Sequence, residues 1–335
     1  MNLNNERYKR FALVREMMET PSVIRSFNTE AVNIFADRVK EKKGMFLSGE
    51  GSSRIFPAKK AIYENLKNGS RFLIATEGAT QALEYDLENY AVFGASNSGQ
   101  TKEVIRLIKA LKDKKHSSCF GLTANNNTTL ESICDLTHVL GCGREDAVAA
   151  TKSVVEQALF YDTLLNILYG SKPFDLNLLA GKLESALTAD IDPEITEAVS
   201  NAGVIYFAGR NTGVAEELTL KTNEITRKRS EFLEGTYGVH GIEEVMNSDE
   251  VLIWINPFPG EVNKFKECLL DGVGMKIIAV SATQTIFPTV IIPEAAFGNE
   301  YIELAAGWNL LVETGLALGI DLDKPERARK VGNEF

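Results

Sequence analysis

Two short stretches of the sequence combine glycine with hydroxyl side chains in a way that suits the binding of a phosphate group. They are residues 49–53 (GEGSS) and residues 96–101 (SNSGQT). Glycine lets the backbone approach a ligand closely, and hydroxyl, amide and backbone N–H groups donate hydrogen bonds to an anion. The donors expected to bind the anion are Ser52, Ser53, Ser96, Asn97, Ser98 and Thr101. For the second stretch alone, helix capping by its two serines explains the sequence equally well.

Neither stretch is a nucleotide-binding motif. The P-loop sequence G-x-x-x-x-G-K-[ST] is absent from both, and the G-x-G at residues 49–51 lacks the third glycine of the dinucleotide motif. The sequence therefore gives little support to a nucleotide ligand.

A row of charged residues in the second half has the side chains that proton transfer needs. Glu217, Lys221 and Glu224 lie within about 40° of one another on a helix that turns 100° per residue, so they share one face. Taken alone, such a row is more often a set of ion pairs on a solvated helix face.

Histidine, which exchanges protons near neutral pH, occurs at only three positions. His240 lies in a segment with glycines on both sides, which favours a loop over a core position. His116 follows a basic run and His138 lies in an apolar run, so both fit structural roles better.

These residues must be positioned by strands and helices, and short apolar runs alternate with longer helical stretches along the chain. That pattern predicts a parallel sheet with crossover helices. In the first half, strands are predicted at residues 45–48, 72–75, 90–94, 119–122 and 137–140. A helix is predicted at residues 101–111, with one buried apolar stripe at the helical period, and a long amphipathic helix at residues 151–168.

The second half repeats this arrangement. Strands are predicted at residues 204–208, 251–255, 276–280 and 290–292, after an acid-rich segment at residues 183–198. We therefore predict an α/β protein of two tandem three-layer αβα sandwiches with parallel sheets of the flavodoxin-like type, divided near residues 170–200. Ligands of such sheets bind beyond the carboxyl ends of the strands, where residues 49–53 and 96–101 lie.

Composition narrows the class of protein. The chain has 36 basic and 46 acidic residues, a net charge of −10, which argues against nucleic acid and anionic membranes as partners. The basic clusters at residues 112–115 and 227–229 are interpreted as solvated helix faces. The cysteines show no metal-binding spacing, so we expect reduced thiols, no metal and a cytoplasmic protein. We expect no signal sequence, and the sequence contains no run of 18 apolar residues.

Three motifs in order resemble the sugar isomerase (SIS) domain family. They are residues 51–53 (GSS), residues 96–101 and residues 149–152 (AATK), and the resemblance covers roughly residues 40–335. In layout the chain is similar to the tandem-SIS isomerase domain of the glucosamine-6-phosphate synthases. The resemblance implies an N-terminal helical segment (1–30), a first SIS domain with the phosphosugar loops (31–175), a second with the catalytic residues (195–320) and a C-terminal tail or lid (321–335).

The resemblance also assigns roles. The family carries a binding glutamate, a catalytic glutamate seven positions later and a catalytic histidine sixteen beyond, intervals that Glu217, Glu224 and His240 keep. It makes Thr151, Glu217 and Lys221 substrate-binding residues. A lysine five positions after a proline, here Lys330, becomes part of a closing lid whose amine contacts the open sugar or forms an imine with it. Taken alone, Lys330 fits a solubilising tail.

The implied chemistry is the interconversion of aldose and ketose phosphates. Glu224 would move a proton between C1 and C2, and His240 would open the sugar ring. Because the family's histidine comes from the neighbouring subunit, a homodimer with a shared active site is implied. Neither a metal nor a redox cofactor is expected.

The sequence departs from the family at several positions. Ile242 stands where a proline is common, residues 236–237 (TY) replace a Gly-Glu pair, and Ala150 replaces a serine. The glutaminase half, with its N-terminal cysteine, is not expected in this chain, and glutamine-driven synthesis is therefore not expected.

Several functions remain open at this stage. An aldose-ketose isomerase, an amino sugar-6-phosphate deaminase and a fructosamine-6-phosphate deglycase all begin with ring opening and a C1/C2 proton transfer. The alternative from another class is a non-catalytic regulatory protein that binds a sugar phosphate. The acidic composition argues against DNA contact by such a regulator.

Overall fold

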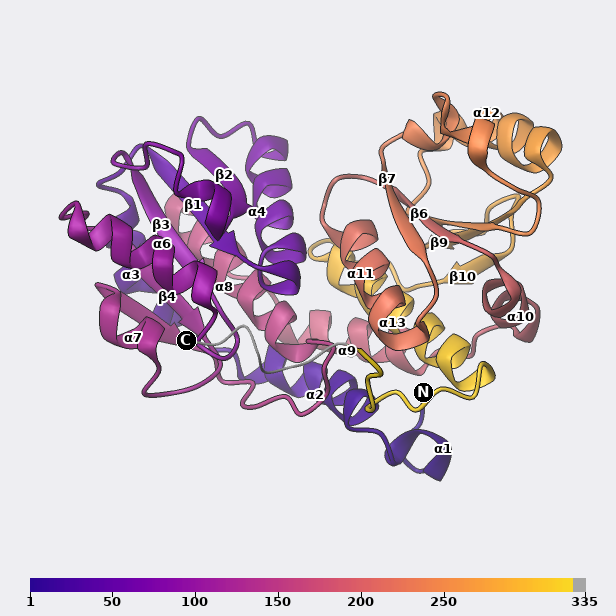
Figure 1. Ribbon diagram of the computed structural model, residues 1–335, viewed down its shortest axis with the longest axis horizontal. Helices are drawn as coiled ribbons and strands as arrows, with labels where there is room; N and C mark the ends of the chain where they lie inside the picture. Colours follow the sequence, from indigo (N-terminus) through magenta and orange to yellow (C-terminus); the bar gives the residue numbers. More distant parts are fainter. Residues whose placement is uncertain (328–335) are drawn as a thin grey trace. The chain divides into compact units, whose positions relative to one another are not determined.

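Ten parallel strands form two five-stranded sheets within residues 1–327, the part of the chain that this computed structural model describes (Figure 1). The chain divides into two units. The first-sheet unit comprises Ser22–Glu145 and Ala150–Leu176, and the second-sheet unit comprises Met1–Pro21, Asp146–Ala149 and residues 177–327. Each unit holds one of the sheets, and the predicted α/β architecture of two sandwiches is confirmed.

The first sheet has the strand order β2-β1-β3-β4-β5, with every pair parallel. Its strands are β1 (Gly44–Gly49), β2 (Leu73–Gly78), β3 (Tyr90–Ala95), β4 (Cys119–Thr123) and β5 (Leu136–Val139). All five coincide with apolar runs predicted to be strands. The order is that of flavodoxin-like sheets, in which β1 and β3 flank the point where the direction of winding reverses.

Helices cover both faces of this sheet. They are η1 (Thr29–Val32), α3 (Asn33–Val39), η2 (Gly51–Ser53), α4 (Ile55–Lys67), α5 (Ala79–Ala82), α6 (Lys102–Asp113), α7 (Thr129–Ile133) and α8 (Lys152–Tyr169). The predicted apolar stripe of α6 is buried at every one of its five positions. In contrast, α8 is not amphipathic as predicted, because residues 152–165 are buried all round the helix.

An aromatic cluster fills the centre of the first-sheet unit. The ring of Phe35 on α3 lies 5.8 Å from that of Phe120 and 5.0 Å from that of Phe160 on α8. His138 on β5 joins this cluster, with its ring centroid 4.9 Å from that of Phe160. Burial lowers the pKa of His138 to about 4, so its ring is neutral near pH 7 and packs as a core residue.

The second sheet has the order β10-β9-β8-β6-β7, which repeats the winding of the first. Its strands are β6 (Ile205–Gly209), β7 (Ser230–Glu234), β8 (Val251–Ile255), β9 (Lys276–Ser281) and β10 (Thr289–Ile291). Four were predicted, but the prediction missed β7. This strand lies at the sheet edge and reads Ser-Glu-Phe-Leu-Glu, so it has no apolar run to mark it.

The remaining helices are mostly in the second-sheet unit. They are α1 (Glu6–Lys9), α2 (Ala12–Ser26), α9 (Leu176–Thr188), α10 (Pro193–Asn201), α11 (Val214–Thr226), η3 (Tyr237–Val239), η4 (Ile242–Val245), η5 (Pro259–Glu261), α12 (Val262–Phe265), the π-helical η6 (Lys266–Val273) and α13 (Asn299–Ala317). The helix α11 packs along the buried helix α13. On the other face, Trp254 of β8 stacks on Phe265 with 3.8 Å between ring centroids.

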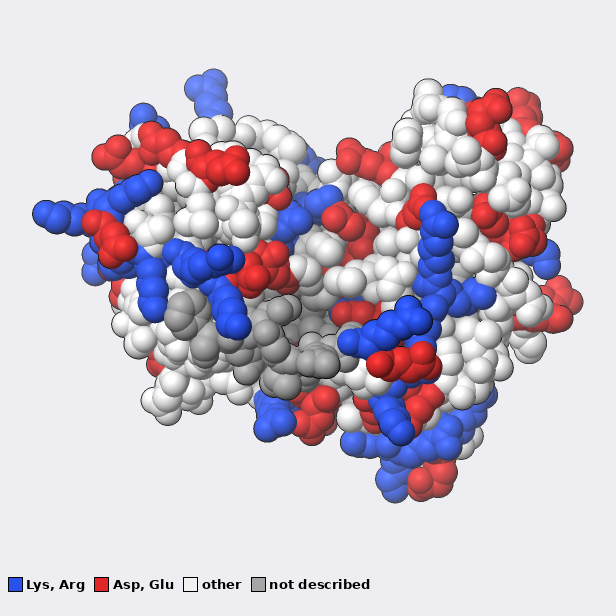
Figure 2. Space-filling model, in the orientation of Figure 1, with Lys and Arg blue, Asp and Glu red and all other residues white. Residues whose placement is uncertain are grey.

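Two surface properties bear on partners. None of the helices in residues 1–327 combines the length and apolar character needed to cross a membrane. Figure 2 shows Lys and Arg interspersed with Asp and Glu on the face that it draws.

Candidate active site

The two stretches predicted to bind phosphate leave the first sheet from neighbouring strands. β1 and β3 pair in parallel with Gly49 opposite Ala95, so residues 49–53 and 96–101 both begin at the carboxyl edge of the sheet, where the winding reverses. A Cβ added at Gly49 would lie 3.0 Å from the Ala95 carbonyl oxygen and 3.0 Å from that of Ser53. Glycine is therefore needed at Gly49 for the tight exit from the strand.

The second stretch is held by its own hydroxyl groups. The Ser96 Oγ lies 2.7 Å from the Thr101 Oγ1 and accepts the Thr101 N–H at 3.3 Å, and the Ser98 Oγ accepts the Gln100 N–H at 3.1 Å. Both serines thus satisfy local backbone groups, as the capping interpretation requires. However, Thr101 at the N-cap of α6 makes no side-chain capping bond, so it leaves the first-turn N–H groups of the helix to other partners.

A buried glutamate that the sequence analysis overlooked connects this stretch to α8. Glu145 is 2% exposed, and its carboxylate accepts hydrogen bonds from the Asn97 side-chain amide (2.9 Å), the Thr151 N–H (2.7 Å) and the Thr151 hydroxyl (3.0 Å). The Ser153 hydroxyl donates to the same carboxylate at 2.5 Å. Since Thr151 gives its hydroxyl proton to Glu145, it is not free to donate that proton to a substrate.

One acceptor in this region lacks a partner. Asn97 uses its amide nitrogen on Glu145, whereas its Oδ1 is buried and accepts no hydrogen bond from the described residues. A buried acceptor without a donor is costly, and a ligand hydroxyl would satisfy it.

The first stretch brings charges that the sequence analysis did not weigh. Ser52 is buried and Ser53 half-buried, while Glu50 accepts the Ala79 N–H at 3.0 Å. Burial raises the pKa of Glu50, although this hydrogen bond opposes the shift. Arg54 directly follows the serines, and its guanidinium lies 4.0 Å from the Glu77 carboxylate. The sequence G-S-S-R could have drawn attention to this cation.

The charged row on α11 is not solvated. The Lys221 Nζ lies 2.7 Å from the Glu224 Oε2 and 3.3 Å from the Glu217 Oε1. The side chains of Lys221 and Glu217 are 0% exposed, and that of Glu224 is 23% exposed. Burial alone would lower the pKa of Lys221, but the carboxylates of Glu224 and Glu217 outweigh it and the pKa is raised. Lys221 is therefore held as a cation between two acids.

Glu224 opens into a pocket near the end of α11. The pocket has a volume of about 370 Å³ and is lined by Asn223, Glu224, Arg227, Pro325, Glu326 and Arg327. The C-terminal segment before residue 328 thus forms one wall of the pocket. Lys330, expected to close over the sugar, lies outside the described residues.

Arg227 is exposed, as predicted for the cluster at residues 227–229, but it is not on a helix face. It follows the end of α11 in the left-handed conformation, with φ +55°. Its guanidinium donates to the carbonyl oxygens of Asp321 (3.2 Å) and Lys324 (2.5 Å) and pairs with Glu326 at 3.2 Å. The prediction missed these contacts because tertiary contacts with a distant segment cannot be read from local charge.

His240 and Glu224 lie toward opposite ends of the strands of the second sheet, His240 at the carboxyl ends and Glu224 at the amino ends. β6 ends where α11 begins, and α11 runs back along the sheet, so Glu224 lies ten residues, or about 15 Å, from the start of the helix. His240 follows the carboxyl end of β7, is exposed, and has its Nε2 3.4 Å from the Lys264 Nζ. The second-sheet unit alone does not bring the two side chains together.

His116 fits the structural role predicted for it. It is buried, and its Nε2 lies 3.0 Å from the Leu87 carbonyl oxygen. Burial lowers the pKa of His116. Within residues 1–327, no group of three or more His, Cys, Asp or Glu is arranged to hold a metal ion.

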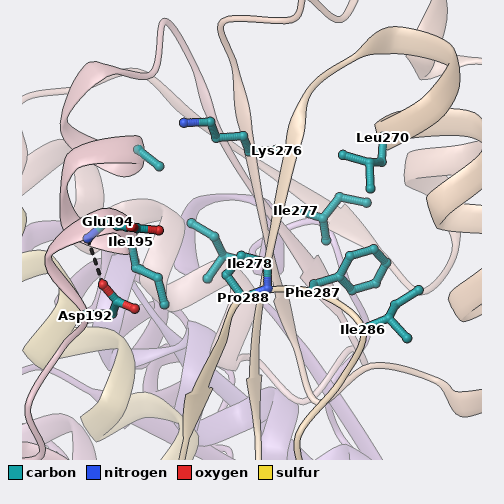
Figure 3. Close-up of a pocket in the computed structure, with 11 residues that line it drawn as sticks. Asp192, Glu194, Ile195, Leu270, Lys276, Ile277, Ile278, Ile286, Phe287 and Pro288 are labelled. Atoms are coloured by element: carbon teal, nitrogen blue, oxygen red, sulfur yellow. Dashed lines mark hydrogen bonds between the residues drawn. The ribbon is translucent and has the colours of Figure 1, made fainter.

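A second pocket of about 280 Å³ lies between α10 and β9 (Figure 3). Ile195, Ile277, Ile278 and Phe287 give it an apolar lining, and Lys276 and Asp192 add charges. None of the predicted site residues lines it. Because hydroxyl donors are absent from its lining, it does not suit a phosphate as the loops of the first sheet do.

Comparison with known proteins agrees with this arrangement. Residues 41–167 match the SIS domain model. The "Glutamine--fructose-6-phosphate aminotransferase [isomerizing]" of Methanocaldococcus jannaschii is 25% identical over 95% of this chain, which spans only 30% of that relative. The C-terminal domain of glucosamine-fructose-6-phosphate aminotransferase from Francisella tularensis superposes with a TM-score of 0.78 at 18% identity, covering 94% of this chain and 98% of that one. Glucosamine-6-phosphate deaminase from Thermotoga maritima superposes with a TM-score of 0.74 at 20% identity, covering 97% of this chain and 99% of that one.

The solved structures share the fold across both sheets. The matched family model spans the whole of the first sheet, both stretches predicted to bind phosphate and the bonds between Glu145 and α8. The first-sheet unit therefore contains an SIS domain at residues 41–167.

Proposed function

We propose that this chain is an enzyme that opens a phosphorylated sugar and transfers a proton between its C1 and C2 carbons. The observation that carries the proposal is the buried row on α11. Lys221 joins two glutamates, of which Glu217 is fully buried and Glu224 opens into a pocket. A carboxylate held beside a buried ammonium group and open on one side is suited to exchange a proton with a bound molecule.

In this proposal the phosphate of the substrate lies at the carboxyl edge of the first sheet. Residues 96–101 contain no acid, and the N-terminus of α6 favours negative charge. Ser52 and Ser53 follow the neighbouring strand β1, in η2. The Asn97 Oδ1, which accepts no hydrogen bond from the described residues, is available to a sugar hydroxyl. Glu145 fixes the amide of Asn97, and Thr151 then acts by ordering α8 rather than by donating to the substrate.

The reaction divides among five side chains. His240 protonates the ring oxygen while the anomeric hydroxyl loses its proton, which opens the ring without net change. Glu224 then takes the proton from C2 of the aldose while the carbonyl oxygen on C1 gains a proton, giving an enediol, or an enolamine for an amino sugar. Glu224 returns its proton to C1 while the hydroxyl or amino group on C2 loses one, giving the ketose or the imine. Glu217 and Lys221 bind the substrate and hold Glu224, and Lys330 contacts the open sugar or forms an imine with it.

The histidine is proposed to come from a second copy of the chain. In one chain Glu224 lies near the amino ends of the strands of the second sheet and His240 follows the carboxyl end of β7, and this separation supports a site shared by two chains. A homodimer in which each His240 serves the partner's Glu224 removes this difficulty.

An assay of the products distinguishes the three reactions that could follow ring opening. The relatives include an aminotransferase with isomerase activity in its name and a glucosamine-6-phosphate deaminase. Incubation with fructose 6-phosphate, glucosamine 6-phosphate and fructosamine 6-phosphates is to be followed by measurement of aldose, ketose, ammonia and free amino acid. Isomerisation, deamination and deglycation then give different products.

The proposal is tested by Glu224→Gln with Glu267→Gln as the control, because Glu267 is exposed on η6 and distant in sequence from the site. We expect Glu224→Gln to abolish turnover while leaving the thermal shift produced by the phosphosugar nearly unchanged. Full turnover by this variant refutes the mechanism. A wild-type chain that binds a phosphosugar but converts none of the three supports the regulatory alternative instead.

A further inference from the structure

Arg227 combines a backbone conformation that arginine rarely adopts with three contacts to one distant segment. A non-glycine residue at φ +55° costs about 1 kcal/mol or more, and such a residue persists when its surroundings hold it. Here its guanidinium is held by two carbonyl oxygens and one carboxylate of residues 321–326. The Arg227 side chain is 28% exposed but that of Glu326 is 67% exposed, so water screens the ion pair and the two bonds to carbonyl oxygens are the main anchor.

The segment that Arg227 holds is also the wall of the Glu224 pocket. After α13 ends at Ala317, the chain turns through residues 321–324, where Lys324 N–H bonds to Asp321 C=O. Residues 325–327 then line the pocket that Glu224 opens into. Arg227 lies three residues after Glu224 and lines the same pocket. Residues 224–227 therefore carry both the carboxylate that opens into the pocket and the arginine that binds the segment forming its other wall.

We propose that Arg227 is a positioning residue that fastens residues 321–327 against the end of α11. It thereby fixes the shape of the Glu224 pocket. The inference rests on the proposed function only in so far as Glu224 acts on a substrate. The anchoring itself is a property of the described contacts and can be measured separately.

The geometry gives a variant that removes the anchor without straining the fold. In Arg227→Gly the left-handed backbone is favourable, which offsets part of the stability lost with the three contacts, so the variant is expected to fold. Glu326→Gln removes only the ion pair and keeps both bonds to carbonyl oxygens. Arg229→Ala is the control, because Arg229 is 74% exposed and its side chain pairs with Glu231 on the same strand.

Two measurements are made on each full-length variant. Limited trypsin digestion is followed by intact mass, with cleavage after Arg327 recognised by the loss of residues 328–335. Steady-state kcat and KM are measured with whichever phosphosugar the wild type converts fastest. We expect Arg227→Gly to raise the rate of cleavage after Arg327 at least tenfold and to lower kcat/KM at least tenfold. Glu326→Gln should raise cleavage two- to threefold, and Arg229→Ala should match the wild type.

The other outcomes refute the proposal in distinguishable ways. A cleavage rate within twofold of wild type in Arg227→Gly shows that Arg227 does not anchor the segment. Faster cleavage with unchanged kcat and KM shows an anchor without a positioning role. If the wild type converts no phosphosugar, the proposed function fails, and the digestion still decides whether Arg227 anchors the segment.

Discussion

Replacing Glu145 by glutamine is expected to loosen the whole anion-binding edge of the first sheet. Two donors, the Asn97 amide and the Ser153 hydroxyl, bond to Oε2, and three more, the Thr151 N–H, the Thr151 hydroxyl and the Ser153 N–H, bond to Oε1. A glutamine has one oxygen and one NH₂ group, so whichever way it turns, the NH₂ faces at least one N–H donor, and the hydroxyl beside it must rotate to accept instead of donating to a carboxylate. Hydrogen bonds to a charged group contribute about 1.5 to 3 kcal/mol each, and losing two amounts to about 3 to 6 kcal/mol before relaxation.

We expect about half of that value to remain after relaxation, as a loss of about 1.5 to 3 kcal/mol in the free energy of unfolding. It is measured by urea denaturation at pH 7, with Glu84→Gln as the control because Glu84 is exposed in the same unit. Phosphosugar affinity should fall at least tenfold in Glu145→Gln and remain unchanged in the control. If Glu145→Gln unfolds within 0.5 kcal/mol of wild type, roughly the value for a neutral surface change, the bonding role assigned to this carboxylate is wrong.

Three further perturbations test other parts of the structure. Changing Ser96 and Ser98 together to alanine should weaken phosphosugar binding at least tenfold by calorimetry, and unchanged affinity would place the phosphate elsewhere. Because the folded-state pKa of His138 is lowered from 6.5 to about 4, the unfolded chain binds its proton first, and stability falls as pH drops from 6.5 to 4 by about 3 kcal/mol. Urea titrations of His138→Phe should show a shallower fall over that window, and an equal fall contradicts the assignment. Gly99→Ala should cost about 1 to 3 kcal/mol, since φ is +67° and a Cβ would lie 2.4 Å from that of Thr128; a urea midpoint equal to wild type would contradict it.

The strands were largely predictable because apolar runs mark buried parallel strands. β1, β3 and β8 have every residue or nearly every residue buried, and their sequences are continuous apolar runs. β7 was missed because it is an edge strand, paired on one side only, in which just two apolar residues stand between two glutamates. Periodicity also placed the apolar stripe of α6 correctly, since that helix covers the sheet with one face.

The site was predictable only where a motif lies within one segment. The row from Glu217 to Glu224 spans two turns of one helix, so its shared face follows from helical geometry, although its burial does not. Glu145 joins donors that lie 48 residues before it and 6 to 8 residues after it, and no local pattern marks such a residue. Arg227 contacts a segment almost 100 residues away, which is why its charge was read as solvated.

The repeated strand order has a consequence for the stoichiometry of binding. At the reversal point of the second sheet, the loops after β6 and β8 are occupied by the chain's own side chains. The Arg210 guanidinium lies 4.2 Å over the Phe258 ring and bonds to the Asn256 carbonyl oxygen, and the Asn256 side chain donates to Glu303 at 3.0 Å. The two sheets of one chain therefore share a strand order but differ in the loops at their carboxyl ends. Titration should accordingly saturate at a single equivalent of phosphosugar for every polypeptide, despite the duplication.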